Sequence, residues 1–204
     1  MAKAAVEGLE AAGCEVLLRR VPETLTDKQM QDAWGIADLK AYKDRLKDIA
    51  VVKNEELVDA DAIIFGTGVI SSLIAPQMNE FINSLGDLWF ENKLLGKPCT
   101  MFGSASNQHG GAEIMFLSFI STVLCHGMIY IGFPPSFKLQ QTKYDEPQGV
   151  SNFGVVSATG YAERDPPLFD KEALKFHACY VAEKAAMLKA GAKVVAKKIE
   201  KAGV

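Results

Sequence analysis

The sequence lacks the features of disulfide-rich, zinc-binding, membrane-spanning and nucleic-acid-binding proteins. Its four cysteines, Cys14, Cys99, Cys125 and Cys179, form no CxxC pair, so we expect neither a disulfide framework nor a zinc site, and no metal. No apolar run is long enough to span a bilayer. The net charge of −3 leaves no basic footprint for nucleic acid and no polybasic membrane anchor. We therefore expect no nucleic-acid partner and no membrane partner.

The cysteine pattern and the first residues also bear on location. Buried free thiols are typical of a reducing compartment, and Met1-Ala2-Lys3 lacks the apolar region of a signal peptide. We expect a cytoplasmic protein. The histidines His109, His126 and His177 have no metal-ligand spacing with the cysteines.

Length and composition suit one packed domain. The chain has 204 residues, 49% hydrophobic and 23% charged, which is enough for a core of useful size. We assign residues 1–190 to one domain and residues 191–204 to a lysine-rich helical extension, with Gly191 as a candidate break in the last helix.

Strand and helix patterns alternate along this domain. Short apolar runs that end in glycine are typical of parallel strands buried on both faces. The alternation predicts a flavodoxin-like, doubly wound parallel α/β sheet. The expected strands are 15–21, 61–66, 97–103 and 128–132, and the expected helices are 3–12, 76–85, 112–125 and 169–190, with a weakly helical stretch at 29–47 inside a long connection.

Loops at the carboxyl ends of parallel strands hold the ligand in such folds. These loops are 66–76, 103–111 and 132–167. The second is rich in small residues and precedes a helix, so its backbone N–H groups and short hydroxyls suit a flat polar ring or a ribityl chain. The alternative is a plain turn with two glycines.

Five blocks along the chain carry a resemblance to a known family. They occur in the family's order and at nearly its spacing, which makes them more specific together than any one alone. The sequence resembles the WrbA-type NAD(P)H:quinone oxidoreductases, flavodoxin-fold proteins that bind FMN, from Met1 to about Pro167. The blocks are Arg20-Val21-Pro22-Glu23-Thr24, Phe65-Gly66-Thr67, Gly86-Asp87-Leu88-Trp89, Ser104–Gly111 with Glu113, and His126-Gly127-Met128-Ile129-Tyr130.

The resemblance implies a reaction and an assembly. FMN would accept a hydride from NAD(P)H and pass two electrons to a quinone, with the protein binding and orienting the flavin. The resemblance also implies a homo-oligomer, a tetramer or a dimer, in which a neighbouring subunit completes each site. The residues implied to bind the cofactor are Ser104, Ala105, Ser106, Asn107, Gln108, Gly110, Gly111, Gly68, Val69 and Ile70.

Two further residues take roles from the resemblance. His126 would be catalytic, polarising a quinone oxygen or donating a proton; the alternative is a histidine favoured by the dipole at a helix end. Trp89 would bind the substrate; the alternative is a core or interface anchor.

The chain departs from the family pattern at the flavin. Family members begin with a strand and a Ser-x-x-Gly loop that holds the FMN phosphate, whereas Met1-Ala2-Lys3 aligns within the helix that follows. We expect that strand, central in its sheet, to be absent, which leaves two strands without a ladder partner. The family's isoalloxazine loop with Arg, Phe and Asn is here the apolar stretch Gly68–Leu73, which offers only its backbone.

Three interpretations follow. The chain is an FMN-dependent quinone reductase, or a non-catalytic relative that binds FMN weakly or not at all and acts through oligomer or partner contacts. The third is a gene product that begins inside a helix and lacks its first strand. The Ser104–Gly111 loop and His126 favour the first interpretation, and the altered stretch Gly68–Leu73 favours the second.

Overall fold

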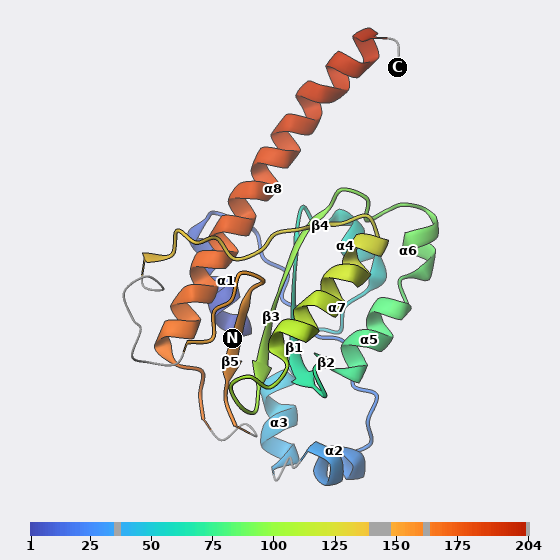
Figure 1. Cartoon of the computed structure of the whole chain (residues 1–204). Coiled ribbons are helices and arrows are strands. Elements are labelled where there is room, and N and C mark those ends of the chain that lie inside the picture. The colour runs from blue at the N-terminus through green and yellow to red at the C-terminus, as the bar shows by residue number, and fades with distance from the viewer. Residues whose placement is uncertain (35–37, 139–147, 161–163, 203–204) are drawn as a thin grey trace.

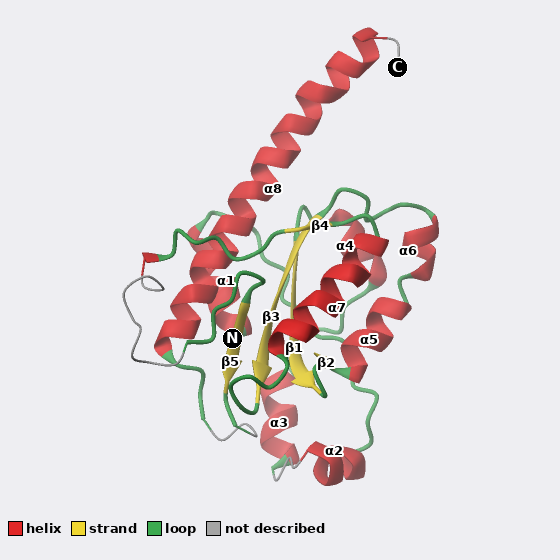
Figure 2. Cartoon of the chain, in the orientation of Figure 1, coloured by secondary structure: helices red, strands yellow, loops and turns green. Residues whose placement is uncertain are grey.

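A parallel sheet between two layers of helices forms the body of the protein (Figure 1; Figure 2). The computed structural model describes residues 1–34, 38–138, 148–160 and 164–202. The strands in this part of the chain are β1 (Ile63–Ile70), β2 (Leu73–Ile74), β3 (Pro98–Ala105), β4 (Ile129–Tyr130) and β5 (Val155–Ala158). The helices are α1 (Ala2–Ala11), α2 (Asp27–Trp34), α3 (Leu39–Leu46), α4 (Asn54–Asp59), α5 (Pro76–Asn83), α6 (Gly86–Phe90), α7 (Ala112–Cys125) and α8 (Leu168–Ala202).

Strand β3 is the centre of the sheet. β1 pairs with it in parallel from Ile63 opposite Cys99 to Gly68 opposite Ser104. On its other side β3 pairs in parallel first with β4 and then, nearer its carboxyl end, with β5. The expected parallel α/β class is confirmed.

The side chains of β3 alternate between two cores. Cys99 and Met101 belong to a core with residues of α5 and α7, while Phe102 belongs to a second core with residues of α1 and α8. Alternation is what an extended strand dictates. Because both faces are covered by helices, β3 is almost entirely buried, as expected for a strand in the middle of a parallel sheet.

The expected strand 15–21 is wrong. The chain there makes only an isolated parallel bridge between Arg20 and Val51, and Leu17 is exposed. A strand needs a ladder of backbone hydrogen bonds, and Cys14–Arg19 has no strand partner among the described residues. β1 is likewise paired on one side only over Ile63–Gly68, because β2 reaches just Val69 and Ile70.

Four other segments differ from expectation. β5 lies inside the stretch expected to be a loop, and the expected loop 66–76 instead forms the β1–β2 hairpin. The expected strand 128–132 is reduced to β4. α8 runs unbroken through Gly191, since one glycine costs a helix only about 1 kcal/mol.

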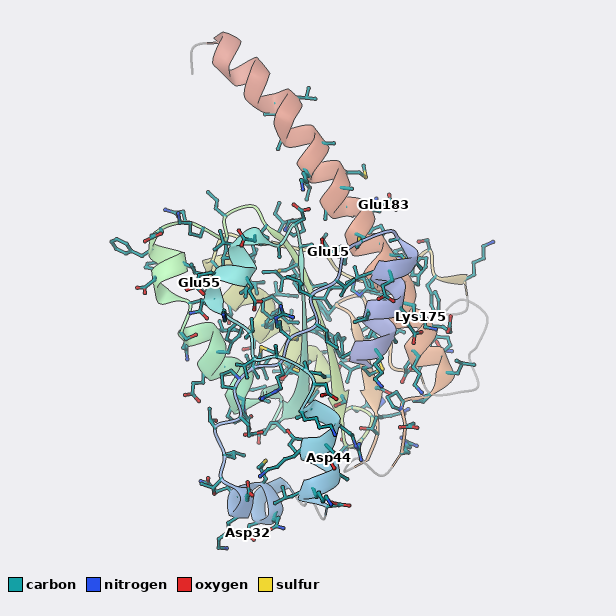
Figure 3. The ribbon with its side chains drawn as sticks, turned by 180° about the vertical axis from the view of Figure 1, so that it is seen from behind. Glu15, Asp32, Asp44, Glu55, Lys175 and Glu183 are labelled. Atoms are coloured by element: carbon teal, nitrogen blue, oxygen red, sulfur yellow. The ribbon has the colours of Figure 1, made fainter. Side chains whose placement is uncertain are left out.

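Helices α1 and α8 pack side by side at a glycine. A Cβ on Gly8 would lie 2.4 Å from the backbone oxygen of Lys175 and 3.0 Å from the Cβ of Ala178. The Cys179 thiol donates to the Gly8 carbonyl oxygen at 2.9 Å. Lys175, labelled in Figure 3, pairs with Glu7 at 2.7 Å. The two helices therefore approach as closely as their backbones allow.

We predict that Gly8→Ala lowers the free energy of unfolding by about 1–3 kcal/mol, because the new methyl group meets backbone rather than a movable side chain. Gly86→Ala is the matched control, since nothing lies within 4 Å of a Cβ there. Chemical denaturation of both variants measures the effect. Equal stabilities would contradict the close packing of α1 on α8.

His177 is a buried titratable group on α8. Its Nε2 lies 3.2 Å from the Ile131 carbonyl oxygen and 3.4 Å from Thr100 Oγ1, and its Nδ1 has no hydrogen-bond partner. Burial lowers the pKa of His177 from 6.5 to about 4. The imidazole is therefore neutral in the folded protein at neutral pH, with Nε2–H donating to Ile131.

We predict that this histidine makes the fold sensitive to acid. Below pH 6.5 the unfolded chain binds a proton at His177, whereas the folded chain does so only near pH 4, so stability falls across that range by about 3 kcal/mol. Denaturation of the wild type and of His177→Gln between pH 7 and pH 4 tests this. The wild type loses more stability than the variant; parallel curves would contradict the assignment. His109→Gln serves as the exposed control.

Candidate functional site

The loop after β3 brings the predicted cofactor residues to the amino-terminal end of α7. Ser104 and Ala105 end the strand, and Gly111 is the N-cap of α7 with φ of 84° and no side-chain cap. The first N–H groups of such a helix have no partner within it, and the helix dipole favours an acceptor or an anion there. The geometry thus presents unpaired backbone donors at the carboxyl end of the sheet.

Two adjacent glycines, Gly110 and Gly111, form the end of this turn where α7 begins. A Cβ on Gly110 would lie 2.5 Å from Asn107 Oδ1, and a Cβ on Gly111 would lie 2.0 Å from Ser72 Oγ. The β1–β2 hairpin therefore presses directly against the start of α7. Since Gly68 pairs in register with Ser104, the structure brings together the two sets of residues predicted to bind the cofactor, Gly68–Ile70 and Ser104–Gly111.

The hairpin limits the backbone groups that Gly68–Ile70 can offer to a cofactor. Val69 pairs with Ile74 and Ile70 with Leu73, so their backbones take part in a ladder. The turn between them places Ser71 and Ser72 at φ of 50° and 65°, which is typical of a tight two-residue hairpin. The apolar stretch is thus a closed hairpin rather than an open loop.

The sequence interpretation missed the residues that hold the glycine-rich loop from the other side. The Thr159 N–H donates to the Ala105 carbonyl oxygen at 2.8 Å, and the Gly160 N–H donates to that of Ser106 at 3.0 Å. Both follow β5. The apolar pair Val155-Val156 was the available signal, but it is too short to stand out as a strand.

FMN fits part of this site. The unpaired donors at the start of α7 and the hydroxyls of Ser104 and Ser106 suit the polar edge of a flavin and its ribityl chain. Residues 104–113 contain no lysine or arginine, and Glu113 lies in the first turn of α7, so a phosphate group finds no matching cation in this stretch.

A cavity of about 240 Å³ adjoins the loop on the β5 side. Its lining includes His109, Glu113, Arg164 and the buried carboxylate of Asp170. Asp170 is fully engaged, accepting hydrogen bonds from Ser157 Oγ at 2.7 Å and the Gly149 N–H at 3.0 Å. Drug-sized ligands occupy cavities of about 300–1,000 Å³, so this hollow is too small for a whole flavin nucleotide.

His126 and Trp89 lie together at the other end of α7. His126 is the residue after Cys125, and the Trp89 indole Nε1–H donates to the Cys125 carbonyl oxygen at 2.9 Å. The Nδ1 atom of His126 is buried and has no hydrogen-bond partner. Burial lowers the pKa of His126, which favours the neutral imidazole at neutral pH.

Helix α7 separates the two groups of predicted site residues. It has 14 residues, which corresponds to a length of about 20 Å. Within one copy, His126 and Trp89 therefore lie far from Ser104–Gly111. Their roles stay predictions.

Two further expectations concern metals and membranes. Within residues 1–34, 38–138, 148–160 and 164–202, no group of three or more His, Cys, Asp or Glu side chains is placed to hold a metal ion. In that same part of the chain, no helix has the length and apolar character needed to cross a bilayer.

A doubly wound parallel sheet with a glycine-lined helix start at its carboxyl edge defines a class of nucleotide- and flavin-binding proteins. The chain belongs to the NADPH-dependent FMN reductase family, whose sequence profile matches residues 1–134.

Curated relatives show more narrowly which proteins the chain is similar to. It is 40% identical over 190 residues to an NAD(P)H dehydrogenase (quinone) of Sinorhizobium fredii, covering 92% of this chain and 90% of the relative. It is 39% identical over 190 residues to one of Geobacter sulfurreducens, covering 92% and 91%. The resemblance to quinone oxidoreductases is confirmed at the level of the family.

A solved structure supports the fold. The WrbA-like flavodoxin of Agrobacterium tumefaciens matches with a TM-score of 0.52 at 19% identity, covering 91% of this chain and 87% of that one. The flavodoxin-like class expected from the sequence is confirmed.

We predict that Gly111→Ala lowers the free energy of unfolding by about 2–4 kcal/mol, through its left-handed backbone and the clash with Ser72. Ser72→Gly alone is close to neutral, because glycine suits its positive φ. The double variant recovers about 1 kcal/mol of the loss, since only the clash is relieved. Additive effects in a double-mutant cycle would contradict the contact between hairpin and helix.

Proposed function

We propose that the protein is an FMN-dependent NAD(P)H:quinone oxidoreductase. The observation that carries this proposal is the glycine-lined, uncapped start of α7 at the carboxyl end of β3, within the region that matches the FMN reductase family. The naming of relatives at about 40% identity as NAD(P)H dehydrogenases (quinone) supports the substrates.

The chain's own residues would bind and orient the flavin. The N–H groups at the start of α7 would donate to the polar edge of the ring, and the hydroxyls of Ser104 and Ser106 would bind the ribityl chain. The hairpin Gly68–Leu73 closes the site from the β1 side and offers apolar surface. The flavin supplies the hydride chemistry when it is bound.

His126 would act on the quinone rather than on the flavin. A neutral imidazole keeps one N–H to donate to a quinone oxygen as negative charge develops there. Trp89, 50% exposed beside His126, offers a flat surface on which a quinone or nicotinamide ring can stack.

Because about 20 Å separates the two ends of α7, we propose that each site combines two copies of the chain. One copy contributes the Ser104–Gly111 loop, and a neighbour contributes His126 and Trp89. A homo-oligomer, dimeric or tetrameric, is the assembly that this requires. Exposed apolar side chains along α7, Ile114, Leu117 and Leu124, give the copies a surface on which to meet.

We predict that two inactive variants restore activity to each other. Ser106→Trp blocks the loop and His126→Gln removes the proton donor, and each alone lowers NAD(P)H:quinone turnover at least about tenfold. In mixed dimers one of the two sites has both halves intact, so co-expression returns up to about a quarter of the wild-type rate. Steady-state assays of co-expressed, co-purified pairs measure this.

Glu10→Gln is the control, because Glu10 is exposed near the end of α1 and belongs to neither half of the proposed site, and its variant keeps its turnover. Inactive single variants with no recovery on co-expression would overturn the shared site while leaving the reaction itself intact.

A second candidate is a non-catalytic member of the family. The ladder pairing of Val69 and Ile70 within the hairpin favours it, because those backbones are partly committed. Titration of the purified protein with FMN, followed by the visible flavin absorbance, separates the two functions. A protein that takes up no FMN and shows no turnover is the non-catalytic relative.

A cytoplasmic location is part of the proposal. The four cysteines are free, and burial raises the pKa of the Cys99 thiol to about 12. Unpaired thiols are typical of a reducing compartment.

A further inference from the structure

The last part of α8 leaves the body of the protein. Lys189 pairs with Asp61 at 2.7 Å at the point of departure, and the helix continues to Ala202. Figure 1 shows this end reaching away from the sheet and the other helices. The body of the protein therefore leaves the apolar side chains of this end exposed.

Exposed apolar side chains lie on one side of this projecting end. Met187 and Leu188 are 59% and 41% exposed, and Val194 and Val195 are 56% and 52% exposed. Val194 follows Met187 by seven residues, and Val195 follows Leu188 by seven. The four side chains therefore form a single stripe along the helix.

The stripe continues onto the body at its lower end. Met187 and Leu188 line an open hollow of about 400 Å³ together with Ile129 and Tyr130 of β4 and with Lys184. Ile129 is itself exposed. The apolar surface thus runs from the edge of the sheet along the helix, with a lysine at its rim.

The charge of the chain is divided unevenly. Residues 184–202 contain six lysines against the single carboxylate of Glu200, a net charge of +5. Since the whole chain has a net charge of −3, the remainder has −8. The expectation that no membrane partner exists came from the whole-chain value, which conceals this division.

We propose that the projecting end of α8 binds the surface of an anionic lipid bilayer. The stripe of Met187, Leu188, Val194 and Val195 enters the boundary between headgroups and acyl chains. Lys184 and Lys189 pair with Glu183 and Asp61, so the positive charge for the acidic headgroups comes from the four lysines that follow in the sequence, Lys193, Lys197, Lys198 and Lys201. Clusters of four to eight basic residues on an amphipathic helix are typical of such binding. The projection keeps this charge at a distance from the acidic body.

A second copy of the chain fits these observations less well. Pairing the same helix from two copies would set lysines against lysines. Docking on the body of another copy would need an apolar groove edged with carboxylates. Four of the carboxylates labelled in Figure 3 are instead spread over separate parts of the body: Glu15 after α1, Asp32 on α2, Asp44 on α3 and Glu55 on α4. The fifth, Glu183, lies on α8 itself and pairs with Lys184.

The test is co-sedimentation of the full chain with vesicles of phosphatidylcholine, with and without phosphatidylglycerol. We expect binding to the anionic vesicles alone, and its loss when salt rises from about 0.1 M to about 1 M. Val194→Gln/Val195→Gln weakens binding about tenfold or more. Leu17→Gln, a change at a side chain of matching 55% exposure, leaves it unchanged.

Several results would overturn the proposal. These are equal binding to neutral vesicles, no binding to either kind, and binding that the double valine variant does not weaken. A fall in oligomeric mass of that variant in ultracentrifugation, without vesicle binding by the wild type, would assign the stripe to a second copy. None of these readouts depends on the proposed reaction.

Discussion

The parallel ladder between β1 and β3 is the interaction on which the rest of the structure depends. β3 also pairs with β4 and β5, so three of the four strand pairings in the described sheet pass through it. Its alternating side chains then separate two cores, with Met101 toward α5 and α7 and Phe102 toward α1 and α8. A Cβ on Gly66 would lie 2.3 Å from a ring atom of Phe102. The spacing of β1 and β3 therefore depends on glycine at position 66.

The site is positioned by the same strand. Because β3 ends at Ala105 and α7 begins at Ala112, the intervening residues make a short turn at the carboxyl edge, held by the hairpin on one side and by the residues after β5 on the other. The helix that supplies donors at its start has His126 at its far end, beside Trp89 of α6. One rigid helix thus determines both the binding half of the proposed site and the need for a neighbour to supply the other half.

Local pattern predicted those elements whose signal is long or strongly apolar. The expected helix 112–125 coincides with α7, and the expected strand 97–103 lies almost wholly within β3. The pattern failed where a strand depends on its neighbours. Glu15–Val21 has the composition of a strand, but no described residue forms a ladder with Cys14–Arg19. β5 is only Val155–Ala158 and is a strand because β3 lies next to it. The order of strands and loops also predicted that Gly68 and Ser104 lie together, and they pair in register. Nothing in the sequence indicated that the length of α7 separates these two residues from His126.

The packing of α1 on α8 joins the two ends of the chain. The Cys179 thiol and the Gly8 carbonyl oxygen that it reaches are 171 residues apart, and α1 finds its principal partner in the final helix. During synthesis the chain emerges from its amino terminus, so Ala4, Ala5 and Gly8 remain without their native cover until α8 has been made. The second core is therefore completed only after α8 has been made, and until then α1 is a surface for chaperones or for neighbouring chains.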